Sequence, residues 1–151
     1  MITKFDGEFR FLSNFWPARV AFEGETYASV EAAYQAAKTL DLRFRQKVRE
    51  CGEDSAAVKK LGKKVGKSVT QWPCWDEEFK LKVMGDLVRQ KFSNPALADL
   101  LLATGEQELE EGNWWGDRFW GVCKGEGRNE LGKLLMAVRE EVKQACEPAL
   151  C

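Results

Sequence analysis

The sequence of 151 residues contains no histidine. This absence excludes Ser-His-Asp and Cys-His triads, histidine-ligated zinc and acid–base catalysis by an imidazole. The sequence also lacks a run of eighteen apolar residues and a basic start followed by an apolar stretch, so we expect neither a membrane span nor a secretory signal. Any chemistry must therefore use carboxylates, lysines, cysteine, tyrosine or backbone groups.

The cysteines form no recognisable framework. There are five of them, an odd number, widely spaced and without a C-x-x-C pair, which argues against a disulfide scaffold and against a zinc ribbon. A reducing cytoplasm is the expected location, and no metal or cofactor is predicted. The cysteines themselves are interpreted as structural or incidental: Cys51, Cys74, Cys123, Cys146 and Cys151.

Net charge is close to zero, because 23 basic residues face 24 acidic ones. No global field therefore draws the chain onto a nucleic-acid backbone, and any such binding must be local. With 44% hydrophobic and 31% charged residues the composition is that of a soluble globular protein. The length predicts a single domain over residues 1–144, followed by a flexible tail over 145–151.

Hydrophobic periodicity predicts an α+β fold that is predominantly helical, with about five helices packed with a small antiparallel sheet or hairpin. Residues 9–27 have the pattern of short strands, with Glu23-Gly24-Glu25 as a hairpin turn. The predicted helices span residues 29–52 with Ser29 as N-cap, 54 or 55 to 61, 76–92, 96–103 after Asn94-Pro95, and the segment that follows Asn129 as cap.

One face of the first predicted helix carries several chemically active groups. Glu31, Tyr34, Gln35 and Lys38 are spaced by three, one and three residues, which places them on the same side. Glu31 and Lys38 are about 10 Å apart along the axis, but the lysine side chain leans toward the N-terminus, so both can reach one sugar. The alternative is the solvated face of an ordinary amphipathic helix.

A second constellation lies in residues 109–121, where three tryptophans stand among acidic residues and glycines. Aromatic faces stack on flat heterocycles, and a carboxylate beside them is partly desolvated, which suits proton transfer. Asp117 is the preferred acid or base, and Trp114 and Trp120 are candidate stacking partners. The alternative is a small aromatic core under a loop.

Three further segments have weaker patterns. The glycine-rich residues 124–129 precede the last helix and contain Arg128, so they can form an anion site, although an ordinary tight turn explains them better. Ser13 and Asn14 stand inside an aromatic run and suit a pocket wall, although core packing explains the aromatic residues equally well. A lysine run over residues 59–67, followed by Trp72 and Trp75, can contact phosphates and bases, although such runs are usually only solvated helix.

The order of these phrases resembles the NADAR family over nearly the whole chain. Six phrases correspond: F-L-S-N-F-x-P at 11–17, S-V-E-x-x-Y-Q-A-x-K at 29–38, W-D-x-x-x-x-x-x-V-M at 75–84, K-F with L-L-x-T-G at 91–105, E-G-N-x-W-x-D-x-F-W-G at 111–121, and G-x-N-x-L-G-x-x-L-M-x-x-R at 127–139. Family members often carry histidine where this chain has Ala32 and Gly116, so its substrate can differ from theirs.

The resemblance implies an N-glycosidase that acts on ribosylated bases. Family activities are hydrolysis of riboflavin-pathway intermediates that bear ribose 5-phosphate, and removal of ADP-ribose from guanine in nucleic acid. By matching motif positions, Glu31, Lys38 and Asp117 are the implied catalytic set. Together, the patterns and the resemblance predict these substrate contacts: Ser13, Asn14, Tyr34, Trp75, Trp114, Trp120, Arg128 and Asn129.

A mechanism follows as a hypothesis. Asp117 or Glu31 assists opening of the sugar ring, and Lys38 attacks C1 to form a Schiff base, which water hydrolyses. Direct attack by water, assisted by a carboxylate, remains an alternative. A different class of protein is also open: a sensor that binds ADP-ribose or NAD without cutting it. A nucleic-acid-binding module is disfavoured by the near-neutral charge.

Overall fold

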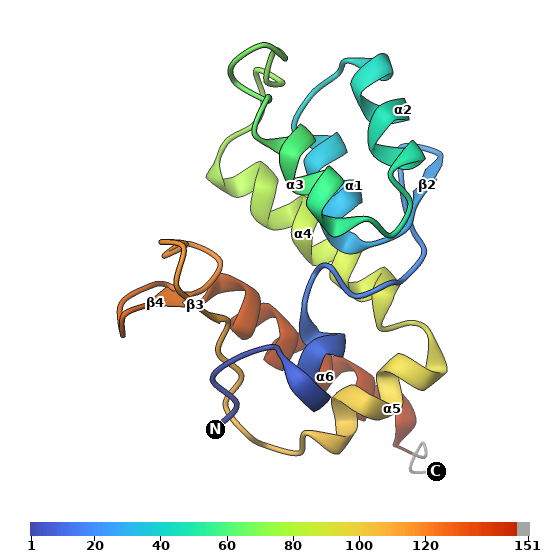
Figure 1. Ribbon diagram of the computed structural model, residues 1–151. Helices are drawn as coiled ribbons and strands as arrows, with labels where there is room; N and C mark the ends of the chain where they lie inside the picture. The colour runs from blue at the N-terminus through green and yellow to red at the C-terminus, as the bar shows by residue number, and fades with distance from the viewer. Residues whose placement is uncertain (148–151) are drawn as a thin grey trace. The chain divides into compact units, whose positions relative to one another are not determined.

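The computed structural model describes residues 1–147, and the described chain has the expected α+β fold, mainly helical (Figure 1). It forms two compact units. One consists of Asn14–Lys91, and the other of Met1–Ser13 together with the chain from Phe92 onward. The expectation of a single domain stays a prediction.

The unit formed by Asn14–Lys91 begins with the predicted hairpin. Strands β1 (Val20–Phe22) and β2 (Glu25–Tyr27) pair antiparallel, with Val20 opposite Tyr27. Glu23 and Gly24 form the turn between them, with φ of 47° and 85°. Two successive positive φ values are typical of the tight turns that match the twist of a hairpin, so this part of the prediction is confirmed.

The long helix predicted over residues 29–52 is wrong, because the chain forms two helices there. Helix α1 (Val30–Ala37) ends at Lys38, and α2 (Leu42–Glu50) begins after Asp41. The Asp41 carboxylate accepts hydrogen bonds from the N–H groups of Arg43 (3.0 Å) and Phe44 (3.1 Å), which caps the second helix. The helical spacing of apolar residues continues from α1 into α2, so the sequence pattern did not reveal the break between the two helices.

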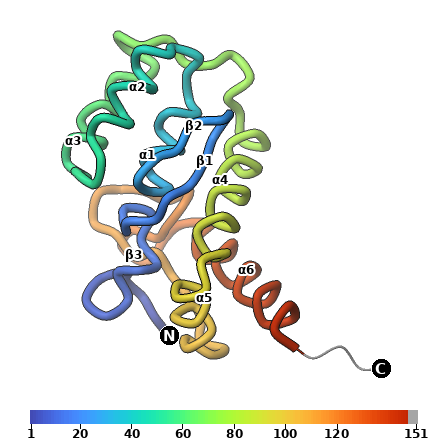
Figure 2. Tube along the Cα trace, turned by 90° about the vertical axis from the view of Figure 1, so that its right-hand side faces the viewer, coloured from blue at the N-terminus to red at the C-terminus, as the bar shows by residue number. Residues whose placement is uncertain are grey.

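Two more helices complete this unit. Helix α3 (Ser55–Gly62) is capped by Asp54 rather than Ser55, since the Asp54 carboxylate accepts from Ala57 N–H (3.1 Å). Helix α4 (Glu77–Lys91) follows Asp76, as predicted. Helix α1 packs against α2, α3, α4 and the hairpin, and Figures 1 and 2 show α1 lying among them. The buried face of α1 is made largely of alanine, and these small side chains let the neighbouring elements approach closely.

The other unit opens with a 3-10 helix, η1 (Gly7–Leu12), where short strands were predicted. Residues 9–12 belong to this 3-10 helix, so the strand prediction is wrong at this end. Helix α5 (Pro95–Ala103) begins as predicted, with the Asn94 side chain accepting from Ala96 and Leu97 N–H. A parallel pair, β3 (Gly112–Asn113) and β4 (Val122–Cys123), was not predicted.

Helix α6 (Glu130–Cys146) is the last element. Leu131, Leu135 and Val138 of the predicted stripe are buried. The helix includes two residues of the predicted tail, Ala145 and Cys146, and residues 148–151 lie outside the described part of the chain.

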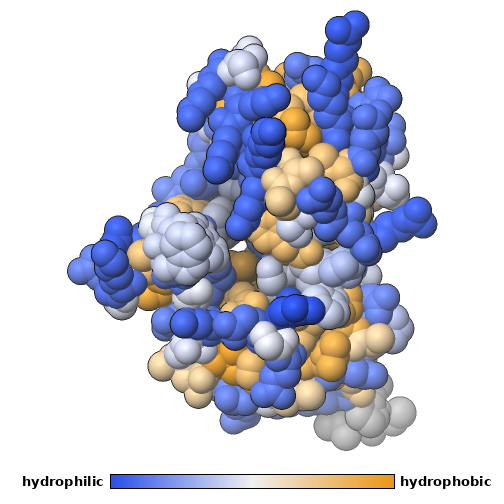
Figure 3. Space-filling model, in the orientation of Figure 1, coloured by the Kyte–Doolittle hydropathy of each residue, from blue (hydrophilic) through white to orange (hydrophobic). Residues whose placement is uncertain are grey.

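The face seen in Figure 3 carries mainly hydrophilic residues, with hydrophobic ones in small groups between them. Within residues 1–147, no helix has both the length and the apolar character that crossing a bilayer requires.

Candidate functional site

The N-terminus of α1 is fixed by two hydrogen bonds that also place Glu31. The Ser29 hydroxyl accepts from Ala32 N–H (3.1 Å), as expected of this N-cap. The Glu31 N–H donates to the Asn14 carbonyl (3.0 Å), so the loop that contains Asn14 lies against the first turn of α1. A carboxylate in this turn is stabilised by the helix dipole.

The Glu31 carboxylate is held by a neighbour on the same helix. Gln35 lies one turn further along, and its Nε2 donates to Glu31 Oε1 at 2.7 Å. Both side chains are half-buried. Gln35 was recognised on the helix face but not counted among the site residues, although a spacing of four residues is the signal for such a pair.

Lys38 occupies the C-cap of α1 and lies beside the ring of Tyr34. Its Nζ is 5.0 Å from the ring centroid of Tyr34, a cation–π distance. The buried Tyr34 ring in turn packs edge-on against Trp75, with centroids 5.3 Å apart. The Tyr34 ring thus contacts both Lys38 and Trp75, two other residues of the predicted site, and Tyr34 lies on the helix that also carries Glu31.

The segment that contains the tryptophans is tied to α1 by its backbone. Trp72 N–H donates to the Lys38 carbonyl at 2.7 Å, and Trp75 N–H donates to the Trp72 carbonyl at 2.9 Å. Both indoles contact Phe79 of α4 edge-on, with centroid distances of 5.1 and 5.6 Å. The hydrogen bond from Trp72 to the Lys38 carbonyl therefore positions the end of α1 relative to the cluster of Trp72, Trp75 and Phe79.

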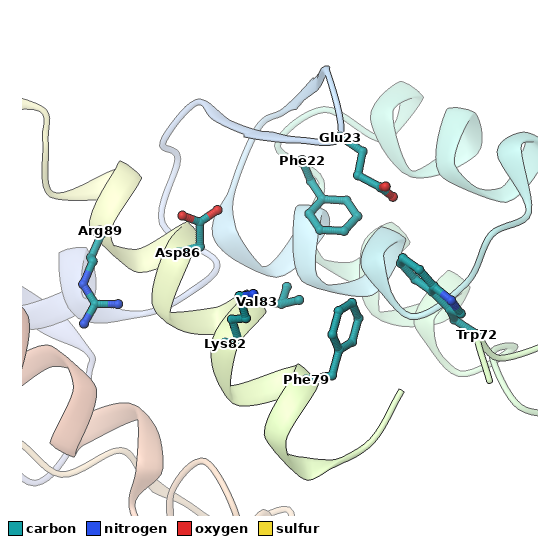
Figure 4. Close-up of a pocket in the computed structure, with 8 residues that line it drawn as sticks. All are labelled: Phe22, Glu23, Trp72, Phe79, Lys82, Val83, Asp86 and Arg89. Atoms are coloured by element: carbon teal, nitrogen blue, oxygen red, sulfur yellow. The ribbon is translucent and has the colours of Figure 1, made fainter. Parts of the chain in front are cut away.

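A cavity of about 400 Å³ opens beside this aromatic cluster in the same unit (Figure 4). The rings of Phe22 and Phe79 point toward one another across it. Glu23 at its edge is engaged with Arg45 (2.8 Å). None of the residues predicted for the site lines this cavity, whose walls are Phe22, Glu23, Trp72, Phe79, Lys82, Val83, Asp86 and Arg89.

In the other unit, Asp117 is fixed within the loop between β3 and β4. Its Oδ1 accepts hydrogen bonds from the N–H groups of Phe119 (3.1 Å) and Trp120 (2.9 Å). The backbone of Asp117 is bonded on both sides to the Asn113 side chain, at 3.0 and 2.8 Å. Within residues 1–147 the second carboxylate oxygen, Oδ2, makes no hydrogen bond, which leaves it as the oxygen that can meet a substrate.

Glu111 and Asn113 connect this loop to the paired strands. Asn113 Nδ2 donates to Glu111 Oε2 at 3.1 Å. Gly121 lies directly against Glu111, and a Cβ added there would collide with the glutamate carboxylate. Neither Glu111 nor Asn113 was placed in the predicted site, although both stand in the E-G-N phrase beside Asp117.

Asn129 has a left-handed backbone (φ 53°, ψ 42°) and its side chain makes no capping hydrogen bond, contrary to the prediction that it caps α6. Instead, Oδ1 accepts from Glu111 N–H (3.0 Å) and Nδ2 donates to the Leu109 carbonyl (2.9 Å). Asn129 thus joins the start of α6 to the segment that leads into β3.

The start of α6 does not offer the anion site considered for residues 124–129. The four backbone N–H groups of residues 128–131 donate to carbonyls within Arg118–Gly121, at 2.8 to 3.3 Å. Cys123 and Glu126 close a tight turn through two mutual hydrogen bonds of 2.8 and 3.1 Å, which confirms the simpler interpretation. The Arg128 guanidinium lies 3.2 Å from Glu130 and 4.6 Å from the centroid of the Phe119 ring.

The remaining predicted contacts differ in exposure. Trp114 is 83% exposed and packs edge-on with Trp115, with centroids 5.7 Å apart. Trp120 is half-buried against Phe119. Ser13 closes η1, its N–H donating to the Arg10 carbonyl (3.0 Å), and Asn14 Nδ2 donates to the sulfur of Met84 (3.5 Å).

The predicted residues are therefore divided between the two units. Asn14, Glu31, Tyr34, Lys38 and Trp75 belong to Asn14–Lys91. The described part of the chain has no group of three or more cysteine, aspartate and glutamate side chains that could hold a metal ion. The residues in the other unit are Ser13, Trp114, Asp117, Trp120, Arg128 and Asn129.

Comparisons with known proteins agree with the resemblance noted in the sequence. A family model described as the NADAR domain matches residues 3–143. A riboflavin biosynthesis protein of Vibrio vulnificus, VVA0006, is 42% identical over 137 residues, which are 89% of this chain. This chain spans only 36% of the length of that relative.

Two further matches concern one protein of Escherichia coli. The N-glycosidase YbiA of strain K12 is 36% identical over 135 residues, covering 86% of this chain and 79% of YbiA. The NMR structure of E. coli YbiA is similar with a TM-score of 0.80 and 31% identity, over 99% of this chain and 90% of that structure.

Proposed function

The chain belongs to the NADAR family and, as its curated relatives are named, is an N-glycosidase; we propose that it hydrolyses the C1–N bond between a phosphorylated ribose and a base. The phosphorylated ribose is ribose 5-phosphate or ADP-ribose. The observation that carries the proposal is the face of α1, where Glu31, Tyr34 and Lys38 share one helix and Trp75 packs on it.

The chemistry requires two kinds of assistance. The sugar ring must open or the leaving base must be protonated, and positive charge that develops at C1 must be stabilised. Glu31 supplies a carboxylate for these tasks on the α1 face, and Asp117 stays a predicted member of the catalytic set. Trp75 supplies an aromatic surface beside Tyr34, which suits the planar base of the substrate.

In the covalent route, a carboxylic acid protonates the ring oxygen, and the bond from C1 to that oxygen breaks to leave an iminium between C1 and the base. The neutral Lys38 amine adds to C1, and the base departs after taking up a proton. The resulting Schiff base between Lys38 and C1 is hydrolysed by water, which frees the sugar phosphate and restores the amine. In the direct route, a water activated by a carboxylate attacks C1 instead.

Borohydride separates the two routes, because it reduces a Schiff base to a stable amine. Protein quenched with borohydride during turnover is digested and analysed by mass spectrometry. The covalent route predicts a sugar-phosphate adduct on the peptide that contains Lys38. Turnover without any adduct assigns the direct route.

The substrate class is tested with a panel of N-ribosylated compounds. Wild-type protein and Lys38→Ala are incubated with ribosylaminopyrimidine phosphates and with oligonucleotides that carry ADP-ribosylated guanine, and released base is measured by mass spectrometry. Release by the wild type and not by the variant supports the proposal. Tight binding of ADP-ribose without release of base from any substrate would instead identify a sensor.

A further inference from the structure

The amide of Gln35 is held in an unusual environment. Its Nε2 donates to Glu31 Oε1 at 2.7 Å, while its Oε1 is buried and has no hydrogen-bond partner in the described part of the chain. Leaving a buried carbonyl oxygen without a donor costs stability. An apolar side chain of the same length would avoid that cost, so stability alone does not explain a glutamine at this position.

Gly62 at the end of α3 lies directly against this amide. A Cβ added to Gly62 would be 2.6 Å from Gln35 Oε1 and 2.7 Å from Gln35 Cδ, closer than real Cβ atoms come to other atoms. Glycine is therefore required there for Gln35 to keep its conformation. Because the chain at Gly62 covers the oxygen, the N–H side of the amide is the side turned to Glu31.

The hydrogen bond has a direction with chemical meaning. An N–H donor favours the ionised form of a carboxylate, because it bonds to the negative charge. A carboxylate that accepts a hydrogen bond at one oxygen also loses rotational freedom, and this fixes the position of its other oxygen. The arrangement suits a carboxylate that remains negative and stabilises positive charge at C1, rather than one that donates a proton.

We propose that Gln35, locked in place by Gly62, is a positioning residue that holds Glu31 ionised and aims it at the developing charge on the sugar. This inference rests on the proposed role of Glu31. It assigns the proton-donating role in ring opening to a group other than Glu31. Glu31 itself is the group that contacts substrate, and Gln35 acts through it.

The test replaces Gln35 by methionine, which keeps the length of the side chain but removes both the donor and the unpartnered oxygen. We expect kcat for base release to fall at least about tenfold. We also expect the acid limb of the kcat/KM profile to move to higher pH by about one unit or more, because the ionised carboxylate has lost its donor. The melting temperature should stay equal or rise.

Gly62→Ala provides an independent route to the same state. The added methyl group pushes the amide off Glu31, so the acid limb should shift in the same direction as in Gln35→Met. In the Gln35→Met background, Gly62→Ala should cause no further shift. The charged and titratable groups on α1 and on the helices packed against it remain the same in these variants; they include Tyr34, Lys38, Arg45, Lys59, Lys80 and Lys91.

The chain contains a matched control. On α6, Gln144 Nε2 donates to Glu140 Oε1 at 3.3 Å with the same spacing and direction, but on an exposed surface. Gln144→Met should leave both kcat and the pH profile unchanged. A Gln35→Met protein with an unshifted acid limb, whatever its melting temperature, would overturn the proposal.

Glu31→Gln separates the two possible failures. If Glu31→Gln releases base as fast as the wild type, the proposed role of Glu31 fails, and the role of Gln35 fails with it. If Glu31→Gln is inactive while Gln35→Met keeps the rate and pH profile of the wild type, only the positioning role of Gln35 is wrong.

Discussion

Among single residues, a polar side chain that the sequence suggests for substrate binding can instead form its hydrogen bonds with the backbone. Asn129 illustrates this, since both of its polar atoms bond to backbone groups, of Leu109 and Glu111. Asp117 gives one oxygen to the N–H groups of Phe119 and Trp120. Residue type and motif position identified these residues, but only the folded geometry shows which atoms remain for chemistry.

Asn129→Ala should lower the free energy of unfolding by about 2–4 kcal/mol, measured by urea denaturation, because two partly buried hydrogen bonds are lost. Alanine is also disfavoured in the left-handed backbone at this position. Asn129→Gly removes the side chain but tolerates that backbone, so it should cost less than alanine. Equal stability of wild type and both variants would contradict the structural role.

Lys91 makes stability depend on pH. Burial lowers the pKa of Lys91 from 10.5 to about 7. Between these values the unfolded chain binds more protons than the folded one, so stability rises with pH above about 7. Below about 7 the cost of burying the charged amine is at its largest and no longer changes with pH. The wild type should therefore gain stability relative to Lys91→Met between pH 7 and 9 in urea titrations, by at most about 1.4 kcal/mol per pH unit.

Two parallel stability curves for these proteins would show that Lys91 is not neutral when buried. Burial also raises the pKa of the Cys51 thiol, with Asp54 and Glu50 adding to the effect. That contribution falls as pH rises through the thiol pKa, and it cancels in the comparison because both proteins contain Cys51.

Among the helices, most starts were predictable because each helix is preceded in the sequence by a residue type that commonly caps helices. Ser29, Asp54 and Asn94 each accept a hydrogen bond from the first turn of a helix. The break between α1 and α2 was missed, since Thr39 forms a long-range hydrogen bond to the Thr70 carbonyl (2.6 Å) that local pattern does not reveal. The short strands β3 and β4 were missed because two residues carry no detectable period.

The same break yields a prediction about α2. Asp41→Ala removes the cap from the N–H groups of Arg43 and Phe44 and should cost about 1 kcal/mol of unfolding free energy. Asp41→Asn keeps an oxygen acceptor and should retain most of the stability. Urea denaturation of the three proteins checks this, and an alanine variant as stable as the wild type would show that the cap contributes nothing.

Glycines of the family phrases also act at the scale of the helices. A Cβ on Gly132 would collide with the Leu109 carbonyl and with the folded-back side chain of Asn129. The G-x-N-x-L-G phrase is therefore explained by close packing at the start of α6. The sequence located this phrase correctly, but its physical reason required the structure.

At the scale of the whole molecule, the α+β class and family membership were predictable because the six phrases extend over nearly the entire chain. The grouping of Glu31, Tyr34 and Lys38 was predictable for a different reason. Helical spacing alone brings these three residues to one side of α1. Trp75 was matched by its phrase, and the structure adds its packing on Tyr34. Gln35 and Gly62 could not be given a role, because their contact joins residues of two different helices.

If the α1 face performs the hydrolysis, substitutions on that face must lower kcat for base release. Glu31→Gln and Lys38→Ala are compared with the exposed controls Glu53→Gln and Lys47→Ala on the best substrate of the panel. We predict a loss of at least about 100-fold in the two α1 variants and wild-type rates in both controls. Wild-type release by Glu31→Gln and Lys38→Ala would show that the α1 face does not perform the hydrolysis and that the chemistry lies elsewhere in the chain.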